Sequence, residues 1–299
     1  MAETVLKLSR VSKTYIIGTR KNAVKAQRAI RHLHKKYEDE CESNASCKKD
    51  TEVVLDKAQA YFTKEKYEEA YLVVTGKSLK PRPKDRGAVV HALDNVDLEI
   101  KKGELVAIVG PSGSGKSTLL NMLGLLDSPT AGQIYLEGTN VTTIKGKKLP
   151  NVRSNDLGFV FQSFNLIPTL TALENVVLPL KYAGISSSQR KDKAKKALEL
   201  VGLGDRLDHT PNELSGGQGQ RVAIARSIVN DPAIIFGDEL TGELDSKMTR
   251  DVMELIQKLN TKGQTFIIVT HNSEVASMCK RIIHMKDGKV EKDHSNGKK

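Results

Sequence analysis

The sequence predicts an α/β fold with a largely parallel sheet, and three observations support this. From residue 89 onward, short apolar runs alternate with longer stretches of helical periodicity. A glycine-rich turn at residues 110–118 lies between one such run and a helix-like stretch. A second apolar run, residues 233–236, ends in Gly237, Asp238 and Glu239. Parallel strands need crossover connections of this kind, usually helices.

Composition limits the possible classes of protein. The chain has 299 residues, of which 38% are hydrophobic, enough for a sizeable core. No stretch reaches the ~20 consecutive apolar residues that a membrane helix needs, and the first residues do not resemble a leader peptide. We therefore expect a cytoplasmic protein. Cys41, Cys47 and Cys279 have no paired spacing and are expected to be ordinary thiols.

The net charge of +11 raises the question of a nucleic-acid or membrane partner. Residues 87–279 carry 20 basic and 21 acidic side chains, so this part of the chain is close to neutral. Residues 20–86 carry 17 basic and 11 acidic side chains, and residues 280–299 carry 7 and 3. The excess positive charge therefore lies in an N-terminal segment and in the tail, and no direct nucleic-acid partner is expected.

The N-terminal part predicts two strands with an excursion between them. Residues 5–15 read as an opening strand, and residues 91–100 as its antiparallel partner. We assign residues 1–21 and 87–290 to one domain, 22–86 to a basic insertion of three short helices, and 291–299 to a flexible tail. The insertion is either a solvated excursion or a docking module for a partner or an anionic membrane face.

The glycine-rich turn matches the phosphate-loop pattern GxxxxGK[ST] between a strand and a helix. Its backbone N–H groups can surround phosphate oxygens, and the helix directs its positive end toward them. Lys116 supplies charge for the β- and γ-phosphates, and the Ser117 hydroxyl is expected to bind Mg²⁺. The expected ATP-binding residues here are Gly110, Pro111, Ser112, Gly113, Ser114, Gly115, Lys116, Ser117 and Thr118.

The two carboxylates after residues 233–236 fit the same chemistry. A strand beside the phosphate loop could deliver both to the γ-phosphate. Asp238 would orient the metal, and Glu239 is the candidate general base for the attacking water. The alternative is that these residues only cap a following helix.

A further motif narrows the class. Leu214, Ser215, Gly216, Gly217 and Gln218 precede a helix-like stretch and resemble the signature of ABC transporter ATPases. A serine and two glycines at a helix N-terminus form a second anion-binding surface on the same chain. The resemblance implies a dimer, because in this family the signature of one subunit closes on the γ-phosphate held by the other.

Other family elements follow in the expected order over almost the whole chain. Gln162 resembles the Q-loop glutamine, which with Ser117 and Asp238 is implied to bind the metal. Residues 241–246 resemble the D-loop, and His271 resembles the switch histidine that contacts the γ-phosphate. Tyr15 resembles the aromatic residue that stacks on adenine, although a core tyrosine is the alternative.

The resemblance implies a phosphate-loop NTPase of ABC ATPase type: a RecA-like core with a parallel sheet, an antiparallel β-subdomain and a helical signature subdomain, with the insertion added. Three features depart from the family pattern. Gly237 and Leu240 replace an alanine and a proline around the carboxylates, Gly219 replaces a glutamine, and the insertion follows Tyr15. Because the carboxylates remain, we expect activity.

The sequence around the motifs is most similar to that of the macrolide-export and lipoprotein-release type of ABC ATPase. The expected function is that of the ATP-binding subunit of a transporter, which hydrolyses Mg-ATP in a homodimer and drives a separate transmembrane permease from the cytosolic face. One alternative is a soluble ATPase acting on nucleic acid or ribosomes. A small-molecule kinase is the other, but it leaves the signature and His271 without a role.

Overall fold

The computed structural model describes residues 3–17, 28–32, 58, 88–144, 146 and 148–297. It divides into two compact units, one of residues 1–11 and 95–299 and the other of residues 12–94. Most of the predicted insertion lies outside the described residues, so its three helices stay a prediction. Residues 28–32 are helical, and Ile30, on the predicted apolar face, is buried.

The first unit contains a mostly parallel sheet, as the sequence predicts. Its strands are β3 (Leu105–Val109), β6 (Leu157–Phe161), β7 (Ile234–Asp238), β8 (Phe266–Val269), β9 (Arg281–Lys286) and β10 (Lys289–Ser295). The order across the sheet is β10-β9-β3-β8-β7-β6. All neighbours are parallel except β9 and β10. The predicted fold class is confirmed.

A second sheet contains β1 (Thr4–Ile17), β2 (Ala88–Lys101), β4 (Ala131–Leu136) and β5 (Thr139–Asn140), in the order β2-β1-β4-β5. The Lys102 N–H donates to the Glu3 carbonyl at 2.9 Å, so the end of β2 lies beside the start of β1. These two strands are therefore antiparallel, as expected.

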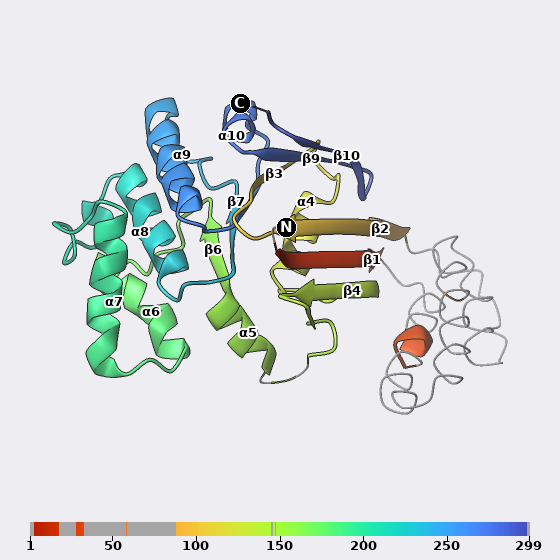
Figure 1. Ribbon diagram of the computed structural model, residues 1–299, viewed down its shortest axis with the longest axis horizontal. Helices are drawn as coiled ribbons and strands as arrows, with labels where there is room; N and C mark the ends of the chain where they lie inside the picture. Colours follow the sequence, from red (N-terminus) through yellow and green to blue (C-terminus); the bar gives the residue numbers. More distant parts are fainter. Residues whose placement is uncertain are drawn as a thin grey trace. The chain divides into compact units, whose positions relative to one another are not determined.

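Helices connect the strands. They are α4 (Lys116–Leu123), α5 (Lys148–Asp156), α6 (Ala172–Tyr182), α7 (Ser187–Leu200), α8 (Gly216–Ile228), α9 (Ser246–Thr261) and α10 (Ser273–Ser277). Helix α4 packs against β7 and β8, whereas α6, α7 and α8 pack against one another, and α8 also contacts α9 and β6 (Figure 1). Helix α8 thus joins the helical group to the sheet.

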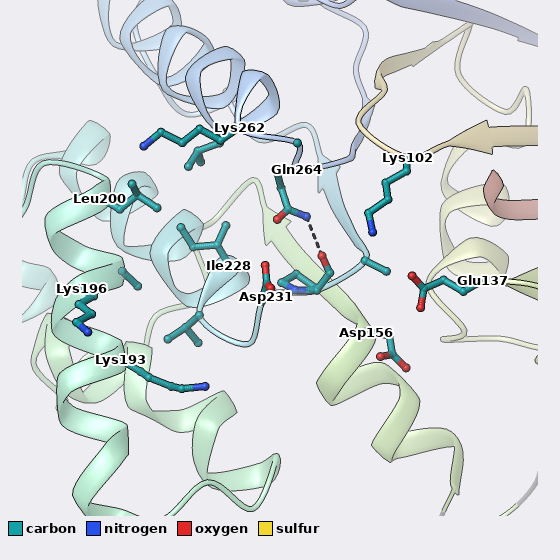
Figure 2. A pocket seen from close by; sticks show the side chains of 16 residues that line it. Lys102, Glu137, Asp156, Lys193, Lys196, Leu200, Ile228, Asp231, Lys262 and Gln264 are labelled. Atoms are coloured by element: carbon teal, nitrogen blue, oxygen red, sulfur yellow. Dashed lines mark hydrogen bonds between the residues drawn. The ribbon is translucent and has the colours of Figure 1, made fainter. Parts of the chain in front are cut away.

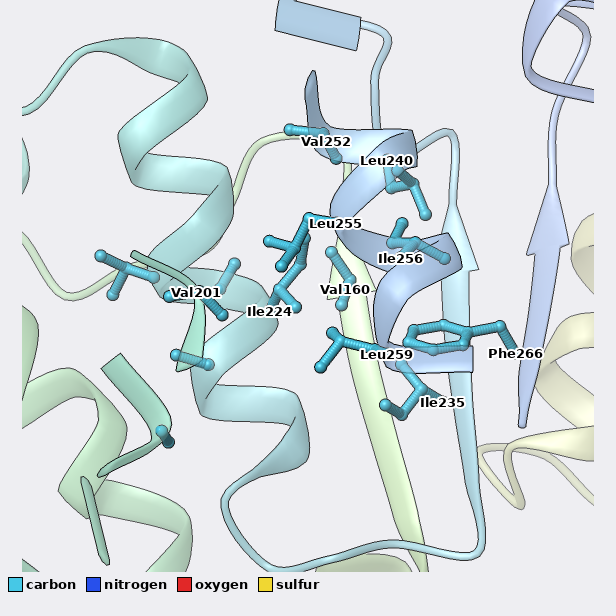
Figure 3. Close-up of a cluster of buried hydrophobic side chains, with 14 of the residues drawn as sticks. Val160, Val201, Ile224, Ile235, Leu240, Val252, Leu255, Ile256, Leu259 and Phe266 are labelled. Atoms are coloured by element: carbon cyan, nitrogen blue, oxygen red, sulfur yellow. The ribbon is translucent and has the colours of Figure 1, made fainter. Parts of the chain in front are cut away.

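The core between these helices and the sheet is apolar. Figure 3 shows Ile224 of α8, Ile256 of α9 and Phe266 of β8 among its members, together with Leu240 from the loop after β7. Each of these four side chains is at most 2% exposed. Burying a side chain of this size contributes about 1.5–3 kcal/mol, so this cluster fixes α8 and α9 against the strands that carry the motifs.

The expectation of a flexible tail is corrected for residues 291–295, because they belong to β10. The sequence there is poor in apolar residues, and polar contacts replace hydrophobic ones. Arg281 of β9 donates to both carboxylate oxygens of Asp293, at 2.8 and 2.6 Å. The Asn296 side chain donates to the Ser277 and Cys279 carbonyls. These partners cannot be read from hydropathy, which explains the wrong prediction.

Candidate functional site

The phosphate loop follows β3 and ends in α4. Gly110 and Gly113 have φ angles of +154° and +78°, and Gly115, directly before α4, has +98°. Such values favour glycine because other residues are strained there. No side chain of the described residues caps α4, so its first N–H groups point into the loop. The Lys116 ammonium donates to the Gly110 and Pro111 carbonyls, both at 2.9 Å.

The β9–β10 hairpin contacts the phosphate loop through its backbone. The Gly288 N–H donates to the Ser114 carbonyl at 3.0 Å. A Cβ atom on Gly110 would lie 2.2 Å from the Met285 carbonyl oxygen, so only glycine fits. Ser114 is 2% exposed, and its Oγ has no hydrogen-bond partner among the described residues. The hairpin therefore fixes the loop conformation through backbone contacts.

Four parallel strands end at one level and deliver the motif residues together. Ile108 of β3 is in register with Val269 of β8, Val269 with Asp238 of β7, and Asp238 with Phe161 of β6. The residues that follow are the phosphate loop, His271, Glu239 and Gln162. The carboxyl ends of parallel strands are the usual place for ligands in such sheets.

Glu239 and His271 form a direct contact. Glu239 has a φ of +47°, and its N–H donates to the Val269 carbonyl at 2.9 Å. Its Oε1 accepts the His271 backbone N–H at 3.1 Å and lies 2.8 Å from His271 Nδ1. The Glu239 side chain is 21% exposed and the imidazole 77%. The glutamate is thus oriented by the histidine while the ring stays open to solvent.

The environment of Asp238 suits a cation. Burial raises the pKa of the Asp238 carboxyl, the charge of Glu239 raises it further, and Lys116 opposes both effects. Within the described residues there is no cluster of three or more His, Cys, Asp or Glu side chains able to hold a metal. Mg²⁺ is normally held by one or two carboxylates together with phosphate oxygens, so this site fits it without such a cluster.

Gln162 packs on the D-loop. A Cβ atom on Gly242 would lie 2.8 Å from Gln162 Nε2 and 3.2 Å from its Cγ. Next to it, the Ser163 hydroxyl donates to Glu243 at 2.8 Å. The Q-loop and the D-loop are therefore in contact, which motif spacing does not reveal.

The departures at residues 237 and 240 compensate for each other. A Cβ atom on Gly237 would lie 2.3 Å from Leu240 Cδ2. Leu240 is 2% exposed and belongs to the core of Figure 3. An alanine at 237 would collide with this leucine, so the glycine makes room for the side chain that stands in place of the proline.

The signature begins α8. The Ser215 hydroxyl accepts the Gln218 N–H at 3.3 Å, and Gln218 Oε1 accepts the Ser215 N–H at 2.9 Å, which is a capping box. A hollow of about 360 Å³ lies beside it, between the ends of α7, α8 and α9. Its lining includes Ser215, Gly217, Gln218 and Arg221 but no residue of the phosphate loop.

The Gly219 departure also has a steric reason. A Cβ atom on Gly219 would lie 3.2 Å from the Phe164 ring. Phe164 and Asn165 have φ angles of +56° and +50°, and Arg226 donates to their carbonyls at 2.8 and 2.5 Å. Burial lowers the pKa of the Arg226 guanidinium. Glycine at 219 thus admits the aromatic ring of the Q-loop segment.

Tyr15 lies in the second compact unit, and its ring is contacted by the Lys13 ammonium at 5.1 Å from the centroid. It is 38% exposed, which does not favour the alternative of a core tyrosine. The adenine-stacking role stays a prediction.

A hollow of about 630 Å³ lies at the other end of the sheet (Figure 2). It is lined by residues before β3, β7 and β8, including Lys102, Ala233 and Gln264. Burial and the charge of Glu137 raise the pKa of Asp156 there. None of the predicted site residues lines it, so it is separate from the motif-bearing loops.

Sequence reasoning missed one buried polar residue near these loops. Gln220 is fully buried, and its side-chain amide donates to the carbonyls of Phe161 and Leu240. The available signal was a glutamine two residues before the apolar run that begins at Val222. A polar side chain on a buried helix face requires a partner.

Comparison with known proteins decides the family. Residues 93–242 match the family model described as ABC transporter, and a Thermotoga maritima ABC transporter ATP-binding protein is 54% identical over 208 residues, 69% of this chain and 89% of the relative. The chain belongs to the ABC transporter family.

Other members of the ABC transporter family agree with this. The lipoprotein-releasing system ATP-binding protein LolD of Bacteroides thetaiotaomicron is 48% identical over 68% of this chain and 94% of its own length. The macrolide export ATP-binding/permease protein MacB of Hyphomonas neptunium is 48% identical over 69% of this chain, which spans only 32% of that relative. A dimeric ATP-binding cassette, MJ0796, bound to ADP and phosphate, superposes with a TM-score of 0.67 at 36% identity, covering 98% of this chain and 99% of the other.

This chain is therefore an ATP-binding and ATP-hydrolysing subunit of an ABC transporter. The relatives support this role and not the soluble ATPase acting on nucleic acid or ribosomes. No helix among the described residues is long and apolar enough to cross a membrane.

Proposed function

We propose that two copies of this chain enclose two Mg-ATP molecules, each held by the phosphate loop of one copy and the signature of the other. The observation that carries this is the common level at which β3, β6, β7 and β8 end. It supports one nucleotide site built from the phosphate loop, Gln162, Asp238, Glu239 and His271. The signature at Ser215 lines a hollow to which no residue of the phosphate loop contributes, which favours a partner molecule as the source of its phosphate.

Glu239 is the proposed general base. Its carboxylate would accept a proton from the attacking water, while the 2.8 Å contact to His271 Nδ1 keeps it oriented. His271 would in addition contact the γ-phosphate through the exposed part of its ring. These are the two groups proposed to take part in the hydrolytic step.

Ser117 and Asp238 are the proposed holders of Mg²⁺, together with Gln162. When bound, the ion would neutralise charge on the phosphates. The raised pKa of Asp238 supports this, since a cation would favour its charged form. Lys116, which now donates to two carbonyls of its own loop, would exchange them for phosphate oxygens.

The permease is proposed to be a separate transmembrane chain, to which this subunit binds at the cytosolic face of the membrane. The support is the similarity to LolD over 94% of that protein, which is named as an ATP-binding protein. The second ATPase subunit is proposed to be another copy of this chain, as in the dimeric cassette MJ0796.

The test compares wild type with Glu239→Gln in the full-length chain. The amide keeps the shape of the carboxylate but cannot accept the proton, so hydrolysis should fall by about 10²-fold or more. The variant should still bind Mg-ATP and accumulate as a dimer in light scattering. Glu254→Gln, an exposed change in α9, is the matched control and should behave like wild type. Unchanged hydrolysis by Glu239→Gln would refute the base assignment, and a monomer in Mg-ATP would refute the shared site.

A further inference from the structure

Gln220 in the second turn of α8 is buried and links two loops. Its side-chain Nε2 lies 3.4 Å from the Phe161 carbonyl and also donates to the Leu240 carbonyl. It is 0% exposed, and its Oε1 has no partner among the described residues. A buried amide with one unsatisfied oxygen costs stability. The contacts it makes therefore need a reason beyond packing.

The two carbonyls have different places in the site. Phe161 is the last residue of β6 and directly precedes Gln162. Leu240 directly follows Glu239, and its side chain is fixed in the core of Figure 3. One amide thus holds the residue before the Q-loop glutamine and the residue after the proposed base.

The same helix holds the rest of the Q-loop segment. Arg226 donates to the carbonyls of Phe164 and Asn165, and Gly219 admits the Phe164 ring at short distance. At its N-terminus, α8 carries Ser215 of the signature. A displacement at Ser215 would therefore be transmitted through one rigid element to both Gln162 and Glu239.

We propose that Gln220 is a positioning residue for ATP hydrolysis, which couples engagement of the signature by the partner's nucleotide to the placement of Glu239 and Gln162. It acts through two backbone carbonyls and not by contact with the nucleotide. The inference rests on the proposed roles of Ser215 and Glu239. Because one amide donates to both carbonyls, closure of the dimer at Ser215 brings the base and the Q-loop to their working positions together.

The chain offers a matched control at the other end of the sheet. Asn260 is 3% exposed, and its amide donates to the Gly103 and Gln264 carbonyls at 2.9 and 2.8 Å. Its Oδ1 is also unpartnered among the described residues. Gly263 and Gln264 line the hollow of Figure 2, away from every predicted site residue. Asn260 has the same burial and the same bonding pattern without a link to the motifs.

The experiment compares Gln220→Met with Asn260→Leu in the full-length chain. Each change removes one buried amide and keeps most of its volume, so both should lower the melting temperature. Only Gln220→Met should lower kcat, by 10-fold or more, while the affinity of the monomer for a fluorescent ATP analogue stays within twofold of wild type. In the Glu239→Gln background it should also weaken the ATP-dependent dimer. A purely structural role would not separate kcat from nucleotide affinity.

Several results would overturn the inference. It fails if Gln220→Met keeps kcat within twofold of wild type, or if Asn260→Leu lowers kcat equally. Should Gln220→Met not fold, Gln220→Asn, too short to reach both carbonyls, replaces it with the same expected loss of kcat. If neither Gln220 variant folds, the amide is structural and the inference is wrong. Ser215→Ala and Glu239→Gln are measured in parallel: wild-type rates in those two would mean that the proposed function, and not only the role of Gln220, has failed.

Discussion

The two helix N-termini that the motifs assign to phosphate are built differently. Helix α4 starts after Gly115 in a left-handed conformation, and no described side chain caps it. Helix α8 starts with a capping box in which Ser215 already accepts the N–H of Gln218. Capping satisfies one of the four N–H groups that a helix start leaves free. The difference indicates that α4 keeps its N–H donors free for the nucleotide that the same chain binds. Helix α8 is already capped, so it has fewer free N–H groups for an anion.

Among changes that leave the backbone of the phosphate loop intact, the largest expected effect on nucleotide affinity concerns Lys116 at the start of α4. Lys116→Ala removes a charge-assisted hydrogen bond to phosphate, which contributes about 1.5–3 kcal/mol, so nucleotide affinity of the monomer should fall about 10- to 100-fold. Calorimetric titration with Mg-ATP measures it. Lys258→Ala, in the last turn of α9, is the control. An affinity equal to that of wild type would contradict the assignment of α4 as the primary phosphate site.

The second prediction separates capping from catalysis at α8. Ser215→Ala and Thr171→Ala each break a capping box, at α8 and α6 respectively, and each should cost ~1 kcal/mol of stability. Only Ser215→Ala should reduce ATP hydrolysis, by about 10-fold, because its hydroxyl would be lost from the shared site. Steady-state ATPase assays beside thermal unfolding test this. Equal rates of hydrolysis in the two variants would mean that Ser215 only caps α8 and has no role in the shared site.

Two glycine substitutions test how much room each phosphate-binding segment has for a side chain, at Gly110 in the phosphate loop and at Gly219 in α8. At Gly110 an alanine would meet backbone at 2.2 Å and adopt a left-handed φ, so Gly110→Ala should abolish nucleotide binding. At Gly219 the gain in helix propensity, up to ~1 kcal/mol, is opposed by the Phe164 ring at 3.2 Å. Gly219→Ala should therefore change the free energy of unfolding by less than about 1 kcal/mol, as measured by urea denaturation. A strong destabilisation by Gly219→Ala would show that Phe164 cannot move.

The smallest effect concerns the charge that faces Lys116. The pKa of Asp238 is raised in the folded protein, so the folded state binds this proton more tightly than the unfolded state does. Its charged form therefore lowers stability, and this penalty appears as pH rises from the ordinary aspartate value through the raised pKa. Asp238→Asn should raise the melting temperature at pH 7, without metal or nucleotide, by no more than about 4 °C. The advantage should vanish below the ordinary aspartate pKa; an advantage that persists there would not come from this charge.

The sequence was sufficient for the parallel sheet, the phosphate loop and the order of the motifs, because glycine patterns and apolar runs reflect local requirements. Contacts between distant residues were not accessible in this way. The Glu239–His271 contact, the fit of Leu240 against Gly237 and the two acceptors of Gln220 depend on strand register and on shape. Strand β10 was missed because ion pairs and amide contacts, rather than apolar side chains, hold it.

The contact between Gly288 and Ser114 has a consequence for how the chain matures. The phosphate loop is made early, but the backbone that presses on Gly110 and Ser114 belongs to a hairpin translated long afterwards. While the ribosome is still producing the intervening segments, the loop lacks this outer support. A nascent chain released before the hairpin would carry every motif, but its phosphate loop would lack the backbone contacts that fix its shape for ATP.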